Sequence, residues 1–384
     1  MGSKSKTGSQ GVKMKIFLLA NANSVHTQRW AMGLAEKGID IFLFSLSQLE
    51  DENLYKNVTN IELYEYGFSN NSTKHDGFGL SKLKYLGVLK SLKEKIKSFN
   101  PDIVHAHYIS GYGTLGMLSG FHPLVLSVWG SDIYDFPHKS FIHKALITHN
   151  LKKADKILST SYVMAKEIQK YSDKEIEVTP FGIDLELFKP MSVSSLFEKD
   201  SMVIGTIKAL DDKYGIEYLI RAFSILTKKY PELSLKLLLV GEGKDENKLK
   251  ELTLELGIED MTTFTGKIAF EEVPIYHNML DVFVSVSTLD SESFGVAIIE
   301  AGACEKPVVV SRVGGLPEVV EEDITGLVVP PRDVNETVNA IEKLLLDLAL
   351  REKMGKKARE RVASLYNWNE NLNQMITIYT KVRA

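Results

Sequence analysis

The sequence predicts an α/β protein with two domains, each built on a parallel sheet. Short apolar runs alternate with helical patterns along the whole chain, which is typical of strands buried on both faces between helices. This rhythm breaks over residues 188–201, a polar stretch that contains Pro190, and then restarts. The 384 residues also exceed what one hydrophobic core usually fills.

The elements follow in order from these patterns. In the first half, strands are predicted at residues 15–20, 39–45, 102–105, 124–129, 156–159 and 176–179, with a helix at 27–37. In the second half, strands are predicted at 202–207, 235–240, 262–265, 281–286, 307–311 and 326–329, before helical stretches at 334–365 and 368–382. We therefore expect Rossmann-like domains at 14–188 and 189–367, with ligands bound in a cleft beyond the carboxyl ends of the strands.

Composition narrows the classes of function. A net charge of -4 and a pI near 6.2 give no overall attraction to nucleic acid or to an anionic membrane. The single cysteine, Cys304, excludes an internal disulfide and fits a reducing cytoplasm, and we interpret it as a small core residue. Residues 1–13 are rich in Gly, Ser and Lys and are interpreted as a disordered lead or tag. No stretch is long and apolar enough to span a bilayer.

The segment Ser291 to Glu300 (SESFGVAIIE) is the most informative one. Glu292 and Glu300 are separated by seven residues, and Gly295 stands where a helix should begin after a strand. Along a helix this spacing corresponds to about 12 Å, enough to reach from a sugar past a diphosphate to a ribose. Backbone N–H groups at a helix start attract phosphate. One capping and one solvated carboxylate is the alternative interpretation.

Two lysines and two histidines could complete such a site. Lys208 and Lys213 are five residues apart in the loop after a strand, where two cations can flank a diphosphate. His105 and His107 share one face of a strand. We interpret His105 as a core residue and His107 as a member of the site. Solvated lysines remain the alternative for the cations, and no third ligand supports metal binding by the histidines.

With these motifs, nearly the whole chain from Met14 resembles the retaining glycosyltransferases of family 4, which have the GT-B fold. The resemblance implies that Glu292 contacts the donor sugar, that Glu300 contacts the ribose, and that His107 lies near the reacting centre. It also implies a helix at 368–384 that packs back on the N-terminal domain. Lys208 stands where the family usually has Arg, which keeps the charge but loses the bidentate contact.

The resemblance also implies roles for loops. The stretch that contains Lys267 and Ile268 would meet the nucleotide base through its backbone, the turn at Gly241–Gly243 would support the donor site, and the turn at Gly314–Gly315 would line the cleft on the side of the second domain. After the first strand the family commonly has a Gly-Gly loop, which this chain lacks. We expect His26, Arg29 and Asp132 on the acceptor side, beside Trp129, which stands where many relatives have histidine.

Other interpretations stay open. Gly111, Gly113 and Gly116 match G-x-G-x-x-G, with Asp132 about twenty residues on, as in NAD-dependent oxidoreductases. A non-hydrolysing sugar-nucleotide 2-epimerase and a non-catalytic nucleotide-sugar binder share the predicted architecture. The basic amphipathic helix at 81–99 has an apolar stripe that favours core packing, with weak contact to the inner face of a membrane as the alternative.

We therefore predict a cytoplasmic, retaining glycosyltransferase that uses a UDP- or GDP-linked sugar and an unknown hydroxyl acceptor. It would need no metal and no cofactor and would bind no nucleic acid. The predicted catalytic residues are His107, Glu292, Lys208 and Lys213. The predicted donor-binding residues are Lys208, Lys213, Lys267, Ile268, Ser293, Phe294, Gly295 and Glu300.

Overall fold

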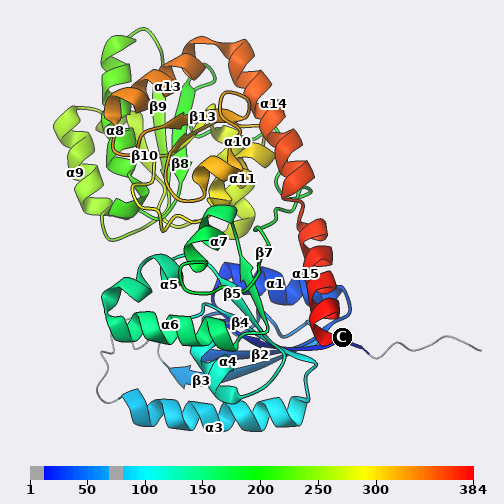
Figure 1. The fold of residues 1–384 in the computed structure, drawn as a ribbon. Coiled ribbons are helices and arrows are strands. Elements are labelled where there is room, and N and C mark those ends of the chain that lie inside the picture. Colours follow the sequence, from blue (N-terminus) through cyan, green and yellow to red (C-terminus); the bar gives the residue numbers. More distant parts are fainter. Residues whose placement is uncertain (1–12, 69–80) are drawn as a thin grey trace, which may run out of the picture. The chain divides into compact units, whose positions relative to one another are not determined.

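The computed structural model describes residues 13–68 and 81–384 (Figure 1). They divide into two compact units, each of which is described by itself. Unit 1 contains Met1–Ser159, Glu167–Glu177 and Leu372–Ala384, within the described residues, and unit 2 contains Thr160–Lys166 and Val178–Asn371.

Unit 1 is built on a seven-stranded sheet with the order β3-β2-β1-β4-β5-β6-β7. Strands β1 to β6 pair in parallel. The central strands β1, β4 and β5 are almost completely buried, because helices cover both faces of the sheet. The strands are β1 Lys15–Leu19, β2 Asp40–Ser47, β3 Ile61–Phe68, β4 Ile103–His107, β5 Leu124–Val128, β6 Lys156–Ser159 and β7 Ile176–Val178.

The helical segments that contribute to unit 1 are α1 Val25–Glu36, α3 Ser81–Phe99, α4 Tyr112–Ser119, α5 Ser131–Tyr134, η1 Phe136–Lys139, α6 Phe141–Lys153, α7 Tyr162–Ile168 and α15 Trp368–Arg383. Helices α7 and α15 are shared between the units. On α3, Val88, Leu92 and Ile96 are buried, so the apolar stripe packs in the fold. Gly116 of α4 lies against β5, since a Cβ there would come within 2.9 Å of Leu124 Cδ1.

Unit 2 is built on a six-stranded sheet with the order β10-β9-β8-β11-β12-β13, all pairs parallel. Its strands are β8 Met202–Ile207, β9 Leu235–Val240, β10 Thr262–Phe264, β11 Val282–Ser285, β12 Val308–Ser311 and β13 Gly326–Val329. Its helices are η2 Asp212–Tyr214, α8 Ile216–Lys229, α9 Glu246–Leu256, η3 Glu259–Met261, η4 Phe270–Glu272, α10 Val273–Met279, α11 Val296–Ala303, α12 Leu316–Val319, α13 Val334–Leu346 and α14 Leu348–Leu365.

The core of unit 2 forms where α8, α9 and α13 pack together on the sheet (Figure 1). Helix α8 supplies an apolar face that includes Leu219, Ile220 and Phe223, all buried. Strand β8 has β9 on one side and β11 on the other. The chain leaves β8 toward one neighbour and reaches the other only later, and such a switch point is where open α/β sheets bind ligands.

The structure confirms the predicted pair of Rossmann-like, parallel-sheet domains. Two local expectations differ. Strand β3 was not predicted, because its burial alternates and it lies at the sheet edge. The helical stretch at 334–365 is two helices, because the Asp347 side chain accepts the N–H of Leu350 and starts α14.

The ends of unit 1 are also defined. Residues 1–12 of the predicted lead lie outside the described part of the chain, and Lys13 pairs with Asp40 at 2.5 Å. From Leu372 onward, α15 belongs to unit 1, where Tyr379 is fully buried. Over the described residues, no helix combines the length and the apolar character that a bilayer crossing requires.

Candidate functional site

Lys208 and Glu292 form a buried ion pair at the carboxyl edge of the unit 2 sheet. Lys208 directly follows β8, and Glu292 lies in the loop between β11 and α11. The Lys208 Nζ is 2.9 Å from Glu292 Oε1, and the two side chains are only 15% and 13% exposed. Burial alone would lower the pKa of Lys208, but the charges of Glu292 and Tyr214 and the hydrogen bond to Glu292 outweigh it and raise the pKa. Lys208 is therefore a fixed cation.

Tyr214 joins Lys208 to Lys213. The ammonium groups of both lysines lie 4.6 Å from the centroid of its ring, a cation–π distance. The turn η2 holds this arrangement, because Asp211 caps the turn and Gly215 closes it with a φ of 67°. The two cations that the sequence predicted as a pair thus meet at one aromatic ring.

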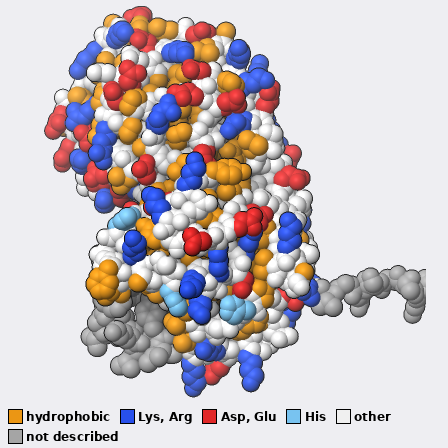
Figure 2. Space-filling view, in the orientation of Figure 1, with side chains coloured by type: hydrophobic (Ala, Val, Ile, Leu, Met, Phe, Trp, Pro, Cys, Tyr) orange, Lys and Arg blue, Asp and Glu red, His pale blue; other side chains and the backbone are white. Residues whose placement is uncertain are grey.

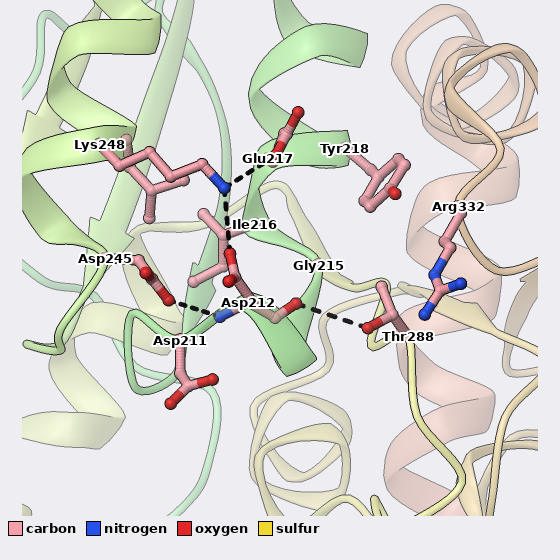
Figure 3. Close-up of a pocket in the computed structure, with 11 residues that line it drawn as sticks. Asp211, Asp212, Gly215, Ile216, Glu217, Tyr218, Asp245, Lys248, Thr288 and Arg332 are labelled. Carbon is pink, nitrogen blue, oxygen red and sulfur yellow. Dashed lines mark hydrogen bonds and ion pairs between the residues drawn. The ribbon is translucent and has the colours of Figure 1, made fainter.

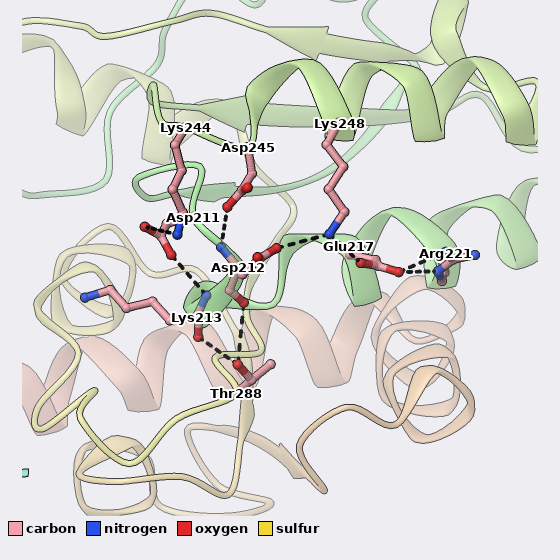
Figure 4. A network of polar contacts seen from close by, with 9 residues as sticks. All are labelled: Asp211, Asp212, Lys213, Glu217, Arg221, Lys244, Asp245, Lys248 and Thr288. Atoms are coloured by element: carbon pink, nitrogen blue, oxygen red, sulfur yellow. Dashed lines mark hydrogen bonds and ion pairs between the residues drawn. The ribbon is translucent and has the colours of Figure 1, made fainter. Parts of the chain in front are cut away.

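The acids around Lys213 already have other partners (Figure 4). Asp211 pairs with Lys244 at 3.4 Å, and Lys248 bridges Asp212 and Glu217 at 3.2 and 3.5 Å. Lys213 forms no ion pair with any described residue, and its side chain extends away from this network (Figure 4). Its charge is therefore available to an anion.

A polar cavity of about 310 Å³ is lined in part by the same turn, through Asp211, Asp212 and Gly215 (Figure 3). Its charged lining consists of four acids, Asp211, Asp212, Glu217 and Asp245, and two cations, Lys248 and Arg332, but neither Lys208 nor Lys213. Acids outnumber cations in this lining, whereas Lys208 and Lys213 present two cations at one ring, so we place the anion site at the two lysines and not in this cavity.

Two glycine turns hold the backbone on either side of the ion pair. A Cβ on Gly241 would lie 2.1 Å from the carbonyl oxygen of Lys208, and one on Gly314 would lie 2.2 Å from that of Glu292. Gly314 and Gly241 also have φ values of 48° and 134°. Only glycine allows these close approaches. The turn expected as scaffold, at Gly241, and the turn expected to line the cleft, at Gly314, are thus in contact with the loops that carry Lys208 and Glu292.

Helix α11 begins beside Glu292. Gly295 is its N-cap residue, with a φ of 88°. Because glycine has no side chain, no side-chain oxygen of the N-cap accepts a hydrogen bond from the first N–H groups of the helix. The Phe294 ring packs between Phe181 and Tyr366, at 5.6 and 5.4 Å between centroids. Because the ring is occupied by this packing, Phe294 could contact a phosphate only through its backbone. Ser293 is also buried.

The second carboxylate of the motif, Glu300, lies within α11 and is 8% exposed. Its Oε2 is 3.5 Å from Nε2 of His277, a residue of α10 that sequence reasoning missed. Lys267 and Ile268 follow β10. The Lys267 side chain is 74% exposed and 4.0 Å from Glu242 Oε1, while the neighbouring Gly266 carbonyl accepts the N–H of Gly241.

In unit 1, His107 ends strand β4 and is 2% exposed. Its ring lies 4.3 Å from that of Trp129 and 4.8 Å, edge-on, from that of His105, and its Nδ1 has no hydrogen-bond partner among the described residues. Burial lowers its pKa well below the usual value, and His105 and His26 add to this. His107 is therefore a neutral imidazole.

His105 is a core histidine, as predicted. Its Nδ1 is 2.6 Å from the Tyr379 hydroxyl and its Nε2 is 2.8 Å from Ser127 Oγ. Burial lowers its pKa to about 3. Helix α15 therefore contacts the strand that carries His107, through the residue two positions before it.

The acceptor-side candidates differ in exposure. His26 is half-buried on α1 and meets the Trp129 ring edge-on at 5.8 Å, and Arg29 lies one turn further along α1. Asp132 is 2% exposed. Its carboxylate accepts the N–H groups of Ile109 at 2.9 Å, Gly130 at 2.9 Å and Trp129 at 3.2 Å. It thus ties the loop after β4 to the loop after β5.

The pKa of Asp132 reflects this position. Burial raises it to about 6, against the lowering effect of the backbone hydrogen bonds. Burial likewise raises the pKa of Cys304 to about 12, so its thiol stays protonated. Within residues 13–68 and 81–384, no three His, Cys, Asp or Glu side chains form a set that could hold a metal ion.

Tyr214 and His277 were not predicted. Tyr214 is adjacent to Lys213 in the sequence, and aromatic residues next to lysines are too common to signal a contact. His277 is 23 residues before Glu300, and only the packing of α10 against α11 brings the two together.

Sequence models of two families match this chain. The model described as glycosyl transferases group 1 matches residues 189–361, and the model described as glycosyl transferase 4-like matches residues 15–161. The first of these matches begins at residue 189, where the rhythm of the sequence changes between the two sheets. Together the matches cover most of the chain.

Curated relatives carry glycosyltransferase names. The chain is 29% identical over 248 residues to D-inositol 3-phosphate glycosyltransferase of Saccharomonospora viridis, an alignment that covers 60% of this chain but only 57% of that protein. It is 27% identical over 309 residues to N-acetyl-alpha-D-glucosaminyl L-malate synthase of Bacillus anthracis, which covers 77% and 79% of the two chains.

Solved structures resemble the whole fold. Sucrose-phosphate synthase from Thermosynechococcus elongatus superposes with a TM-score of 0.80 at 22% identity, covering 96% of this chain and 99% of the other. Anabaena Alr3699/HepE in complex with UDP gives 0.78 at 17% identity, covering 96% and 100%. At these identities the likeness establishes the architecture.

Proposed function

Because the chain belongs to the glycosyl transferases group 1 and has the GT-B fold, we propose that it transfers a sugar, with retention, from a nucleoside-diphosphate sugar to a hydroxyl acceptor. We further propose that the reaction needs no divalent metal. The observation that carries the proposal is the meeting of Lys208 and Lys213 at the Tyr214 ring, with Glu292 bound to Lys208.

The donor diphosphate would lie against these lysines and the start of α11. Two ammonium groups and unsatisfied backbone N–H groups favour a phosphate and stabilise the charge that develops on it as it leaves. Neighbouring acids do not cancel Lys213, because Lys244 and Lys248 neutralise them. In this proposal, cations of the chain do the work that a divalent ion does elsewhere.

The reaction would proceed on one face of the sugar. The bond between the anomeric carbon and the phosphate oxygen breaks, and its electron pair stays with the diphosphate. The acceptor oxygen forms a bond to the anomeric carbon on the same face and gives its proton to the departing phosphate oxygen. Glu292 would orient the sugar hydroxyls, and the neutral imidazole of His107 would contact the sugar without adding a charge.

The nucleotide of the donor and the location of the protein in the cell are proposed from a relative and from the composition of the chain. Alr3699/HepE was solved with UDP and with UDP-glucose, which favours a uridine or related donor here. Acidic and basic side chains are interspersed over the face of unit 2 that Figure 2 shows, and the net charge is -4, so we propose that the protein does not bind nucleic acid. The single cysteine, Cys304, fits a reducing cytoplasm, so we propose a cytoplasmic protein. Contact of α3 with an anionic membrane would use the exposed Lys90, Lys93 and Lys97.

A thermal-shift panel of UDP-, GDP- and ADP-sugars tests the proposal first. We expect one base to stabilise the protein, and turnover to release the matching nucleoside diphosphate, also in the presence of EDTA. Interconversion of the sugar nucleotide without release would instead show an epimerase. Binding without any turnover across a panel of acceptors would show a binder.

A further inference from the structure

His277 is a buried imidazole that no sequence motif explains. It lies on α10, its side chain is fully enclosed, and neither ring nitrogen has a hydrogen-bond partner among the described residues. An unpaired buried polar group costs free energy, and most such groups in folded proteins are satisfied. A polar partner supplied or brought closer by a ligand would remove that cost.

The polar group that faces His277 is Glu300. The distance from His277 Nε2 to Glu300 Oε2 is 3.5 Å, just beyond the range of about 2.7–3.2 Å for N–H···O hydrogen bonds. Glu300 is 8% exposed, and its carboxylate accepts no hydrogen bond from any described residue. A small movement of the carboxylate toward the ring would satisfy both groups.

Two aromatic rings also flank His277. Its ring lies 5.4 Å from that of Phe283 and 6.3 Å from that of Phe188, centroid to centroid. Aromatic walls offer no competing acceptor and exclude water, which strengthens a hydrogen bond formed between them. Glu300 is thus the acceptor that His277 can reach.

We infer that His277 is the positioning residue of Glu300 and sets a preference for ribonucleotide over deoxyribonucleotide donors. The inference rests on the proposed function, in which Glu300 accepts hydrogen bonds from the ribose hydroxyls. An N–H at Nε2 that donates to Oε2 fixes the plane of the carboxylate and leaves its other lone pairs for the diol. Without the imidazole, the carboxylate can rotate, and the contact with the ribose weakens.

The test compares ribose and dideoxyribose binding to the full chain. Calorimetric titration with UDP, GDP and ADP identifies the diphosphate that binds, and its 2′,3′-dideoxy form is then titrated. We expect wild type to prefer the ribonucleotide by at least about tenfold, since a site built for hydroxyls is left unpaired without them. His277→Leu should weaken the ribonucleotide about tenfold and the dideoxy form less than twofold, so the preference disappears. His277→Gln, which keeps an N–H donor, should retain most of it.

Phe283→Leu is the matched control, because it disturbs the same aromatic surroundings without touching a polar group. It should change both affinities alike. His277→Phe replaces His277→Leu if the latter does not fold. Equal weakening of both nucleotides by the His277 variants overturns the inference while nucleotide binding stands. If none of the three diphosphates binds wild type, the proposed function is overturned and the inference with it.

Discussion

Lys208 and Glu292, from loops that follow different strands, form an ion pair at 2.9 Å in which neither side chain is more than 15% exposed. A pair this enclosed is held in place by its surroundings, and a ligand that binds one partner must act on the other. A diphosphate that approaches Lys208 would compete with Glu292 and release its carboxylate toward the sugar. In the proposed mechanism, the ion pair would thus link donor binding to the orientation of Glu292.

Glu292→Gln should lower transfer at least about 100-fold, the scale at which single positioned polar groups contribute to transition states. The amide keeps the shape but loses the charge that orients the sugar and restrains Lys208. Steady-state kinetics with the donor identified by thermal shift gives the measurement. Glu246→Gln, which removes a partly exposed acid paired with Lys250 on α9, should leave the rate unchanged. A Glu292→Gln enzyme with normal turnover would remove Glu292 from the mechanism.

Lys213→Ala should raise the donor KM and lower kcat together, because one cation would serve both the bound diphosphate and the leaving group. We expect a combined loss in kcat/KM of about 100-fold. Lys250→Ala removes a lysine that pairs with Glu246 along α9 and lies 5.5 Å from the centroid of the Phe264 ring, and it serves as the control. If KM rises while kcat stays at the wild-type value, Lys213 contributes to binding alone.

Gly314→Ala should reduce both stability and activity, because its Cβ would lie 2.2 Å from the Glu292 carbonyl oxygen. Gly257→Ala is a matched control, since Gly257 has a φ of 68° but no atom near the added Cβ. The control should cost about 1–2 kcal/mol for the left-handed backbone alone. Urea unfolding and kinetics of both variants separate the two effects. If Gly314→Ala and Gly257→Ala lose the same stability, the loop that carries Glu292 accommodates the added Cβ without a loss of free energy.

His105 should make stability depend on pH. Its pKa in the folded chain is about 3, because it is buried, whereas the usual value is 6.5. Between these values the unfolded chain binds a proton that the folded chain does not, so stability falls as the pH falls below 6.5. At pH 5.5 this loss is about 1.4 kcal/mol.

His105→Gln removes that titration, so the stability advantage of wild type should shrink between pH 7.5 and 5.5. Thermal unfolding at the two pH values measures it. His149, which is exposed on α6, provides the control substitution His149→Gln, for which the difference from wild type should not change. A constant difference for His105→Gln would show that His105 titrates normally.

The sequence predicted most of the fold, because the buried parallel strands are continuous apolar runs. It did not predict β3, whose Glu62 and Glu65 give a polar alternation suited to an edge strand. It joined α13 to α14, because one Asp at residue 347 is a weak signal for a cap until its bond to Leu350 is seen. An apolar run in the sequence indicates that a strand is buried. Whether a strand lies at the edge of a sheet, or where a helix is capped, depends instead on residues that become neighbours only in the folded chain.

The candidate site was predictable to the same extent. Glu292, Lys208 and Lys213 stand in recognisable local patterns, and the structure brings Glu292 to Lys208 and both lysines to Tyr214. The ring of Tyr214 and the imidazole of His277 have no local pattern, since they act on groups brought near by tertiary packing. Asp132 was predicted on the acceptor side, yet the structure occupies its carboxylate with three backbone N–H groups. The sequence gives no signal for these hydrogen bonds, because they depend on how the two loops lie in the folded chain.

The hydrogen bond between Tyr379 and His105 joins residues 274 positions apart. During synthesis, the first sheet emerges from the ribosome long before residue 379 does. Until then, the surface that Tyr379 later covers stays open to water, and His105 lacks one of its two partners. Native packing around β4 is therefore completed late in synthesis. A nascent chain on a ribosome stalled before α15 would lack this hydrogen bond, and its N-terminal unit would not be fully packed.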